Sequence, residues 1–98
     1  MARARRAYVP NRHTDAAFSE AELKAFMAGV WVPCTSSHIT FARYLADREE
    51  LQVGFKSGDR IAYTGILPDM AEDFGQAPSK MGWCWDALIP NKWPYHPI

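Results

Sequence analysis

The clearest hydrophobic pattern in the chain is a pair of short arms between residues 51 and 66. Apolar side chains occupy every second position of each arm, which is typical of strands with one buried face; they are Leu51, Val53, Phe55, Ile61 and Tyr63. A three-residue turn, Ser57-Gly58-Asp59, keeps all of them on one face, whereas a two-residue turn would invert the second arm. We therefore predict a hairpin with Phe55 opposite Ile61 and Val53 opposite Tyr63. Gly or, less readily, Asp can supply the positive φ that this turn needs.

The residues before the hairpin predict further extended structure. The run from His38 to Tyr44 is rich in β-formers and alternates, so we expect it to be the third strand of an antiparallel meander. Residues 47–50 are polar and form the turn into Leu51. Residues 30–33 are also expected to be extended, because a residue that precedes proline avoids the helical region.

Two helices are predicted on either side of this meander. Ser19 and Glu22 have the spacing of a capping box, and the apolar side of the short helix that follows ends near Gly29. A second helix begins at Pro68, with three acidic residues where the helix dipole favours negative charge, and ends before Pro78. The predicted fold class is α+β, a three-stranded antiparallel meander with an N-terminal helix and a covering helix after the sheet.

The C-terminal part gives a weaker pattern. Residues 81–89 fit either a further strand or a short helix. Pro90, Pro94 and Pro97 argue against regular structure beyond them, so residues 92–98 are expected to lie against the surface through Trp93 and Tyr95.

Length and charge divide the chain into an arm and a body. Its 98 residues suffice for one domain, which we assign to residues 18–98, after a basic flexible arm at residues 1–17. Four arginines and no acid occur in the first 13 residues, which leaves seven basic and eleven acidic residues in the remainder, a formal charge of −4. Such an arm can attract phosphates, or can simply keep a tail solvated.

The cysteine content and hydropathy predict the compartment. Two cysteines are too few for a disulfide framework, and the chain has no signal-peptide pattern and no apolar run of membrane-spanning length. We expect a soluble protein of the cytoplasm with no membrane partner.

Several segments resemble the KTSC domain, a module of small bacterial and phage proteins that is also found at the C-terminal end of some lysyl-tRNA synthetases. The resemblance runs from about Val32 to Ile89 and is carried by short motifs: Ser36-Ser37-His38-Ile39, Tyr44, Leu51-Gln-Val53-Gly-Phe55-Lys-Ser-Gly58 and Leu67-Pro68. Ile61-Ala62-Tyr63 keeps only the second tyrosine of the family's central pair. One residue is added before Pro68, and another within Ser79-Lys80-Met81-Gly82. The resemblance implies mostly a fold and, more weakly, an RNA partner.

No catalytic or metal site emerges from the residue pattern. Ser36, Ser37 and His38 are adjacent in sequence, but a hydrolytic dyad also requires an oxyanion hole and an orienting acid. Cysteine and histidine occur without Cys-x-x-Cys spacing. We therefore expect a protein that is not an enzyme and needs no cofactor or metal.

Bases and aromatic residues alternate towards the C-terminus, which is the chemistry used to bind single-stranded nucleic acid. We predict a binding module for RNA, single strands or a nucleotide, with these residues in contact with the ligand: Arg3, Arg5, Arg6, Tyr63, Lys80, Trp83, Trp85 and Lys92. Two alternatives remain. The indoles could be the edge of a core, or the protein could be a small interaction or inhibitor protein, of the kind phages encode, that acts on a bacterial protein. Dimerisation through an edge strand at residues 38–44 is compatible with either function.

Overall fold

The computed structural model describes residues 17–98. Arg3, Arg5 and Arg6 of the basic arm lie outside the described residues, so the structure does not bear on their predicted role. The elements are α1 (Glu20–Met27), β2 (Val32–Pro33), β3 (Ile39–Leu45), β4 (Glu50–Phe55), β5 (Arg60–Thr64), α2 (Pro68–Gln76), α3 (Lys80–Trp83), the π-helix η1 (Cys84–Leu88) and β6 (Tyr95–Pro97).

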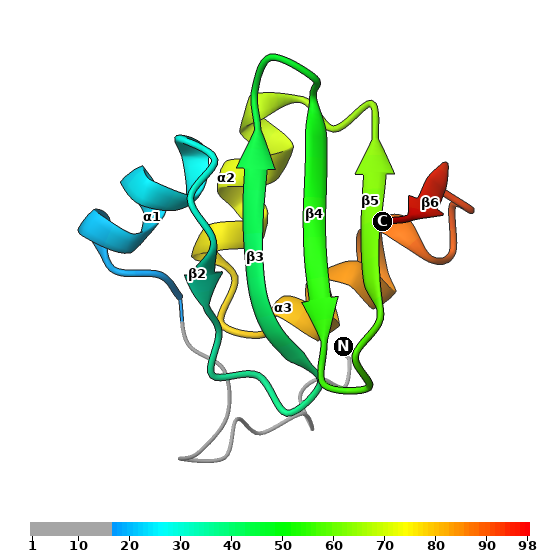
Figure 1. Ribbon diagram of the computed structural model, residues 1–98, viewed down its shortest axis with the longest axis horizontal. Coiled ribbons are helices and arrows are strands. Elements are labelled where there is room, and N and C mark those ends of the chain that lie inside the picture. The colour runs from blue at the N-terminus through cyan, green and yellow to red at the C-terminus, as the bar shows by residue number, and fades with distance from the viewer. Residues whose placement is uncertain (1–16) are drawn as a thin grey trace.

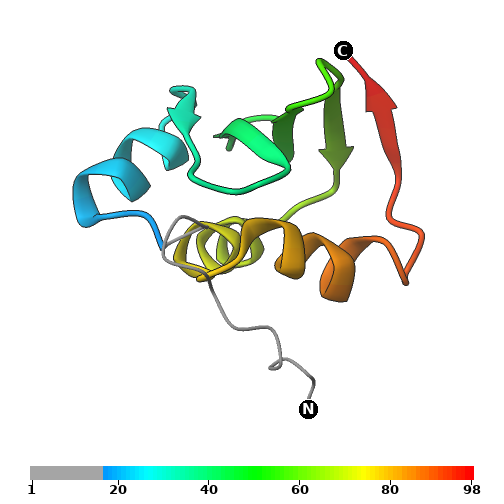
Figure 2. The ribbon, with the colours of Figure 1, turned by 90° about the horizontal axis from the view of Figure 1, so that it is seen from below.

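The molecule has two layers. Five strands form an antiparallel sheet in the order β2-β3-β4-β5-β6, and α2, α3 and η1 cover one face of it (Figures 1 and 2). Helix α1 lies at the β2 end of the sheet. The α+β class is therefore confirmed, but the sheet has five strands rather than the three expected. Because β2 and β4 both pair with β3, the segment from residue 38 to residue 44 is not the sheet edge that we considered for dimerisation.

The hairpin has the predicted parity but not the predicted pairing. Val53 faces Ile61 and Leu51 faces Tyr63, so the register is displaced by two residues from our prediction while the same side chains share one face. The turn is Lys56-Ser57-Gly58, closed by hydrogen bonds from the Phe55 N–H to Asp59 O (2.8 Å) and from the Gly58 N–H to Phe55 O (2.9 Å). Gly58 is the third and last residue of this turn and has the positive φ of 99°. We had predicted that the turn would end one position later, at Asp59.

Our prediction that prolines exclude regular structure at the C-terminus is wrong. Strand β6 pairs with β5, with His96 opposite Ala62. Proline is compatible with an edge strand when its missing N–H points away from the neighbour. Here Pro94 contributes its carbonyl, which accepts from the Thr64 N–H (3.1 Å), and the Ile98 N–H donates to Arg60 O (3.0 Å).

Both predicted helix starts are present. The Ser19 hydroxyl accepts from the Glu22 N–H (3.1 Å) while the Glu22 carboxylate accepts from the Ser19 N–H (2.8 Å), which completes the capping box. Pro68 is the first residue of α2. The segment 81–89, where strand and helix were both open, is helical almost throughout, since α3 and the π-helix η1 together span residues 80–88.

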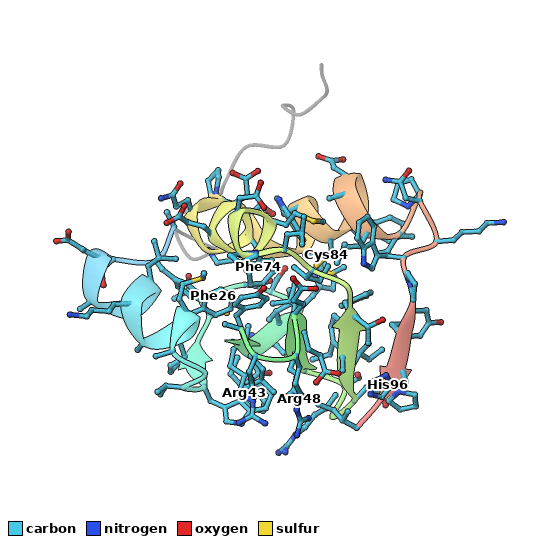
Figure 3. The ribbon with its side chains drawn as sticks, turned by 90° about the horizontal axis from the view of Figure 1, so that it is seen from above. Phe26, Arg43, Arg48, Phe74, Cys84 and His96 are labelled. Atoms are coloured by element: carbon cyan, nitrogen blue, oxygen red, sulfur yellow. The ribbon has the colours of Figure 1, made fainter. Side chains whose placement is uncertain are left out.

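The core lies between the sheet and the helices, where Phe26, Phe74 and Cys84 project in Figure 3. The Phe26 ring stacks on Phe74 (5.7 Å between centroids) and on Tyr44 (6.5 Å), which joins α1, α2 and β3. The Tyr44 hydroxyl donates a 2.6 Å hydrogen bond to Ile66 O. No helix formed by residues 17–98 covers the opposite face of the sheet, and we call it the open face.

Candidate nucleic-acid interface

A pocket of about 420 Å³ lies where η1 and the C-terminal segment meet the β5–β6 edge of the sheet. We call it the C-terminal pocket; aromatic and aliphatic side chains line most of it, among them Ile61, Tyr63, Ile89, Trp93 and Tyr95, with Lys92 as its cation. Small-molecule sites are usually concave, mostly apolar, and supplied with a few polar groups. The C-terminal pocket has this composition.

Hydrogen bonds fix the chain segment that forms one wall of the pocket. The Trp93 indole N–H donates to Thr64 O (2.7 Å), and the Trp93 backbone N–H donates to Leu88 O (3.1 Å). Trp93 is therefore tied both to the end of β5 and to the end of η1. The pairing of β6 then places Tyr95 beside Tyr63, with 5.7 Å between ring centroids and 51° between ring planes.

Tyr63 lines the pocket and is 6% exposed. Burial raises the pKa of its hydroxyl to about 12, and the ionisable groups of Cys84 and Tyr95 act in the same direction. The hydroxyl is therefore protonated at neutral pH and can both donate and accept a hydrogen bond. Tyr95, by contrast, is 62% exposed and offers a ring face to a ligand.

The structure brings together two of the residues that we predicted from the sequence, Tyr63 and Lys92, in this pocket. Lys92 is exposed and has a positive φ of 51°. Trp83 is half-buried and packs edge-on against Phe74 (5.5 Å), and Trp85 is 58% exposed on η1. Neither indole lines the C-terminal pocket.

Lys80 occupies a different place from the one expected of a ligand-binding cation. Its side chain is fully buried; Nζ donates to Ala77 O (2.9 Å) and lies 4.5 Å from the centre of the Phe18 ring. The ammonium thus joins the end of α2 to the segment before α1 and has no surface to offer a ligand.

Sequence reasoning missed a second group of residues, on the open face. We call Trp31, Phe41, Arg43 and Arg60 the open-face cluster. The Arg43 guanidinium lies over the Trp31 ring (4.5 Å), the Trp31 ring meets Phe41 edge-on (4.8 Å), and the Arg60 guanidinium lies over Phe41 (5.3 Å). This series crosses from β3 to β5 because Gly54, on the strand between them, has no side chain.

Arg43 is also held from the side. Its Nε donates to Gln52 Oε1 (2.8 Å), and Gln52 Nε2 donates to Glu50 Oε1 (2.8 Å). Glu50 is 7% exposed and lies 3.7 Å from Arg48 Nη1 and 3.9 Å from His96 Nε2. Arg43, Arg48 and His96 all project from the open face in Figure 3.

The alternation of residues along β3 could have predicted this cluster, since Phe41 and Arg43 alternate with Ala42 and Tyr44 and therefore lie on the other face of the sheet. An irregularity between Ile39 and Phe41 concealed it. The two residues share a parity in the sequence, yet Ile39 faces the core and Phe41 the open face, because a bulge inserts one residue.

The described residues offer little for catalysis or metal binding. The Ser37 hydroxyl and His38 Nδ1 are 3.0 Å apart on an exposed loop, with no carboxylate hydrogen-bonded to that imidazole in residues 17–98. Over the same range no three His, Cys, Asp or Glu side chains gather as a metal site. None of the described helices combines the length and the apolar character needed to span a membrane.

Comparison with known proteins places these features in a family. The family model of the KTSC domain matches residues 35–87, more than half of the chain. This protein belongs to the KTSC domain family. A crystal structure of a KTSC domain protein from Yersinia pestis is similar, with a TM-score of 0.63 and 26% sequence identity over 69% of this chain and 94% of that one. No curated protein matches the sequence. In this KTSC protein the matched region contains β3, β4, β5 and α2, whereas α1 and the C-terminal pocket's Trp93 and Tyr95 lie outside it.

Proposed function

We propose that this KTSC protein is a non-enzymatic binding module for RNA, another single-stranded nucleic acid or a nucleotide, and that a base of the ligand occupies the C-terminal pocket. The observation that carries the proposal is the meeting of three aromatic rings and one lysine around a single hollow. A base needs flat apolar surfaces, which Tyr95 and Trp93 supply, and polar partners at its edge, which the Tyr63 hydroxyl supplies. Lys92 lies where it can meet a phosphate.

The proposal is tested by titrating the protein with uridine monophosphate and with single-stranded RNA at low salt while following tryptophan fluorescence. Stacking of one base contributes about 1 to 3 kcal/mol, so Tyr95→Ala lowers affinity by roughly 5-fold to 150-fold. Trp85→Ala is the matched control, because Trp85 is an exposed aromatic residue outside the pocket. If neither ligand quenches the tryptophan fluorescence at low salt, the proposal is wrong.

A second function has its own support. Trp85 and Ile89 are four residues apart on the C-terminal helical segment and are 58% and 39% exposed, which is the kind of apolar pair that anchors protein interfaces. Under this alternative the protein is a small interaction or inhibitor protein for a bacterial partner. A partner that survives nuclease treatment and high salt, and is lost with Trp85→Ala but kept with Tyr95→Ala, would favour it.

A further inference from the structure

The open-face cluster presents cations rather than ring faces. Arg43 covers a face of Trp31 and Arg60 covers a face of Phe41, at 4.5 and 5.3 Å from the ring centres. Base stacking on those covered faces is therefore blocked. The groups that remain for a ligand are the guanidinium N–H donors, which suit phosphate and carboxylate oxygens.

Arg43 is positioned before any ligand arrives. The ring of Trp31 supports its guanidinium plane, while Gln52 accepts from Nε and is itself held by the nearly buried Glu50. An arginine anchored in this way loses less conformational freedom on binding than a free surface side chain. Within residues 17–98 neither terminal nitrogen of Arg43 has a hydrogen-bond partner, so both remain available for an anion.

Charge is distributed unequally between the two sides of the molecule. The open face carries Arg43, Arg48 and Arg60, and the carboxylate of Glu50, which β4 places on the same face, is nearly buried beside Arg48 and His96. The acidic residues Asp69, Glu72 and Asp73 lie exposed on α2, in the layer on the other side of the sheet. A polyanion is therefore attracted to the open face and repelled by the helical layer.

We infer that the open-face cluster binds phosphates of a single-stranded nucleic acid, with Arg43 and Arg60 as the phosphate-binding residues and with Gln52 and Glu50 as positioning residues for Arg43. The inference rests on the proposed function, since it takes the strand to be the one whose base occupies the C-terminal pocket. His96 lies on the open face of β6 and Tyr95, its neighbour, on the pocket side. A strand that leaves the pocket reaches the open face around this edge.

A nucleic acid suits the cluster better than an acidic protein does. Arg43 and Arg60 come from β3 and β5, separated by β4, so their backbones are roughly 10 Å apart across the sheet. A nucleic acid strand carries a charge at every nucleotide and meets both arginines without a special sequence. A peptide needs two carboxylates at one particular spacing.

The test measures binding of the full chain to a fluorescein-labelled oligouridylate of about 12 nucleotides, a length within the usual range of single-strand sites. Binding is followed from about 50 to 200 mM salt, and the slope of log K against log[salt] gives the number of phosphate contacts. Arg43→Gln and Arg60→Gln are each expected to reduce the magnitude of this slope by about 0.7. Affinity falls roughly tenfold at the lowest salt, since charge-assisted hydrogen bonds are lost.

Two further variants distinguish the effect of a positioned guanidinium on binding from the effect of positive charge alone. Lys24→Gln removes one exposed positive charge from α1 and leaves both slope and affinity unchanged. Arg43→Lys keeps the charge but loses the planar fork, so it keeps the wild-type slope and binds more weakly. If Arg43→Lys binds with full wild-type affinity, the positioning of the Arg43 guanidinium by Gln52 and Glu50 does not contribute to binding.

The outcomes distinguish this inference from the proposed function. If the arginine variants keep the wild-type slope while uridine monophosphate binds, the inference is wrong and the pocket proposal stands. If uridine monophosphate does not bind but the oligonucleotide slope depends on Arg43 and Arg60, the pocket proposal fails and the inference stands. If the wild-type protein binds no oligonucleotide, the inference is overturned, and Arg43-dependent binding of polyglutamate would assign the open face to an acidic protein.

Discussion

Gly54 on β4 lies directly against the ring of Phe41 on β3, so that a Cβ at position 54 would come within 2.7 Å of Phe41 Cδ1. Aromatic carbons cannot tolerate this approach, and the ring is also in contact with Trp31 and Arg60. We expect Gly54→Ala to displace Phe41 and to lower the free energy of unfolding by about 1 to 3 kcal/mol, the usual cost of overpacking. Urea denaturation measures this change.

A double variant gives the matched control for this prediction. Phe41→Ala removes all the ring atoms that meet the new Cβ, so Gly54→Ala is expected to cost less in that background than in the wild type. Equal costs in both backgrounds would show that the contact between Phe41 and position 54 does not limit the substitution.

The raised pKa of Tyr63 predicts that the folded protein loses stability at high pH. The unfolded chain releases the phenol proton near pH 10, whereas the folded protein keeps it until about pH 12. Between these values the unfolded state binds fewer protons, so stability is fully present below pH 10 and decreases as the pH rises through 12. The loss amounts to roughly 2 to 3 kcal/mol, from about 1.4 kcal/mol for each pH unit.

Alkaline urea titrations check this prediction. Tyr63→Phe is expected to abolish the loss of stability that the Tyr63 phenol causes between pH 10 and 12. Tyr95→Phe, at a ring that is 62% exposed, is the control that retains this loss. If Tyr63→Phe and the wild type lose the same stability between pH 10 and 12, the phenol of Tyr63 is not responsible.

Lys80 is predicted to act through packing rather than through ligand binding. Lys80→Met keeps most of the stem volume, whereas Lys80→Ala leaves a cavity beneath Phe18 and Phe74. We expect Lys80→Ala to lose about 2 to 5 kcal/mol of stability and Lys80→Met to lose less. Lys80→Met should also bind oligouridylate as the wild type does. A folded Lys80→Met protein with weakened binding would contradict this assignment.

Trp93 is predicted to hold the C-terminal segment against β5. Trp93→Phe keeps an aromatic ring but removes the indole N–H that donates to Thr64 O. Loss of one such hydrogen bond costs about 0.5 to 1.5 kcal/mol. The opening is expected to be local, with faster hydrogen exchange at the Thr64 N–H, which donates to Pro94 O. Trp85→Phe, at an exposed indole, should leave that exchange rate unchanged.

Local chemistry in the sequence predicted the parts of this fold that depend on neighbouring residues. Ser19 and Glu22 cap α1 as their spacing indicates, and Pro68 begins α2. The hairpin parity was also correct, because a buried face selects the alternation. The turn position was not, because Gly58 can serve either as the second or as the third residue of a three-residue turn.

Features that depend on distant partners were not predictable in the same way. Strand β6 exists because the edge of β5 accepts it, whereas in the segment alone Pro94 and Pro97 outweigh the strand preference of Tyr95 and Ile98. The C-terminal pocket combines β5 with a segment about thirty residues later, so only its members Tyr63 and Lys92 were anticipated. Lys80 was read as a surface cation, since nothing in the sequence marks a lysine stem that fills space between Phe18 and Phe74.

The π turn at Cys84–Leu88 can accommodate an inserted residue in the chain close to the C-terminal pocket. Its Ile89 N–H bonds back five residues to Cys84 O (3.0 Å), so the turn holds one residue more than an α-helical turn would. From the resemblance to the family motif we also expect the segment just upstream, Ser79-Lys80-Met81-Gly82, to be longer by one residue in this chain. A widened turn can take up such an insertion within the helix, which lets Leu88 stay in the interior and spares the five-stranded scaffold any readjustment.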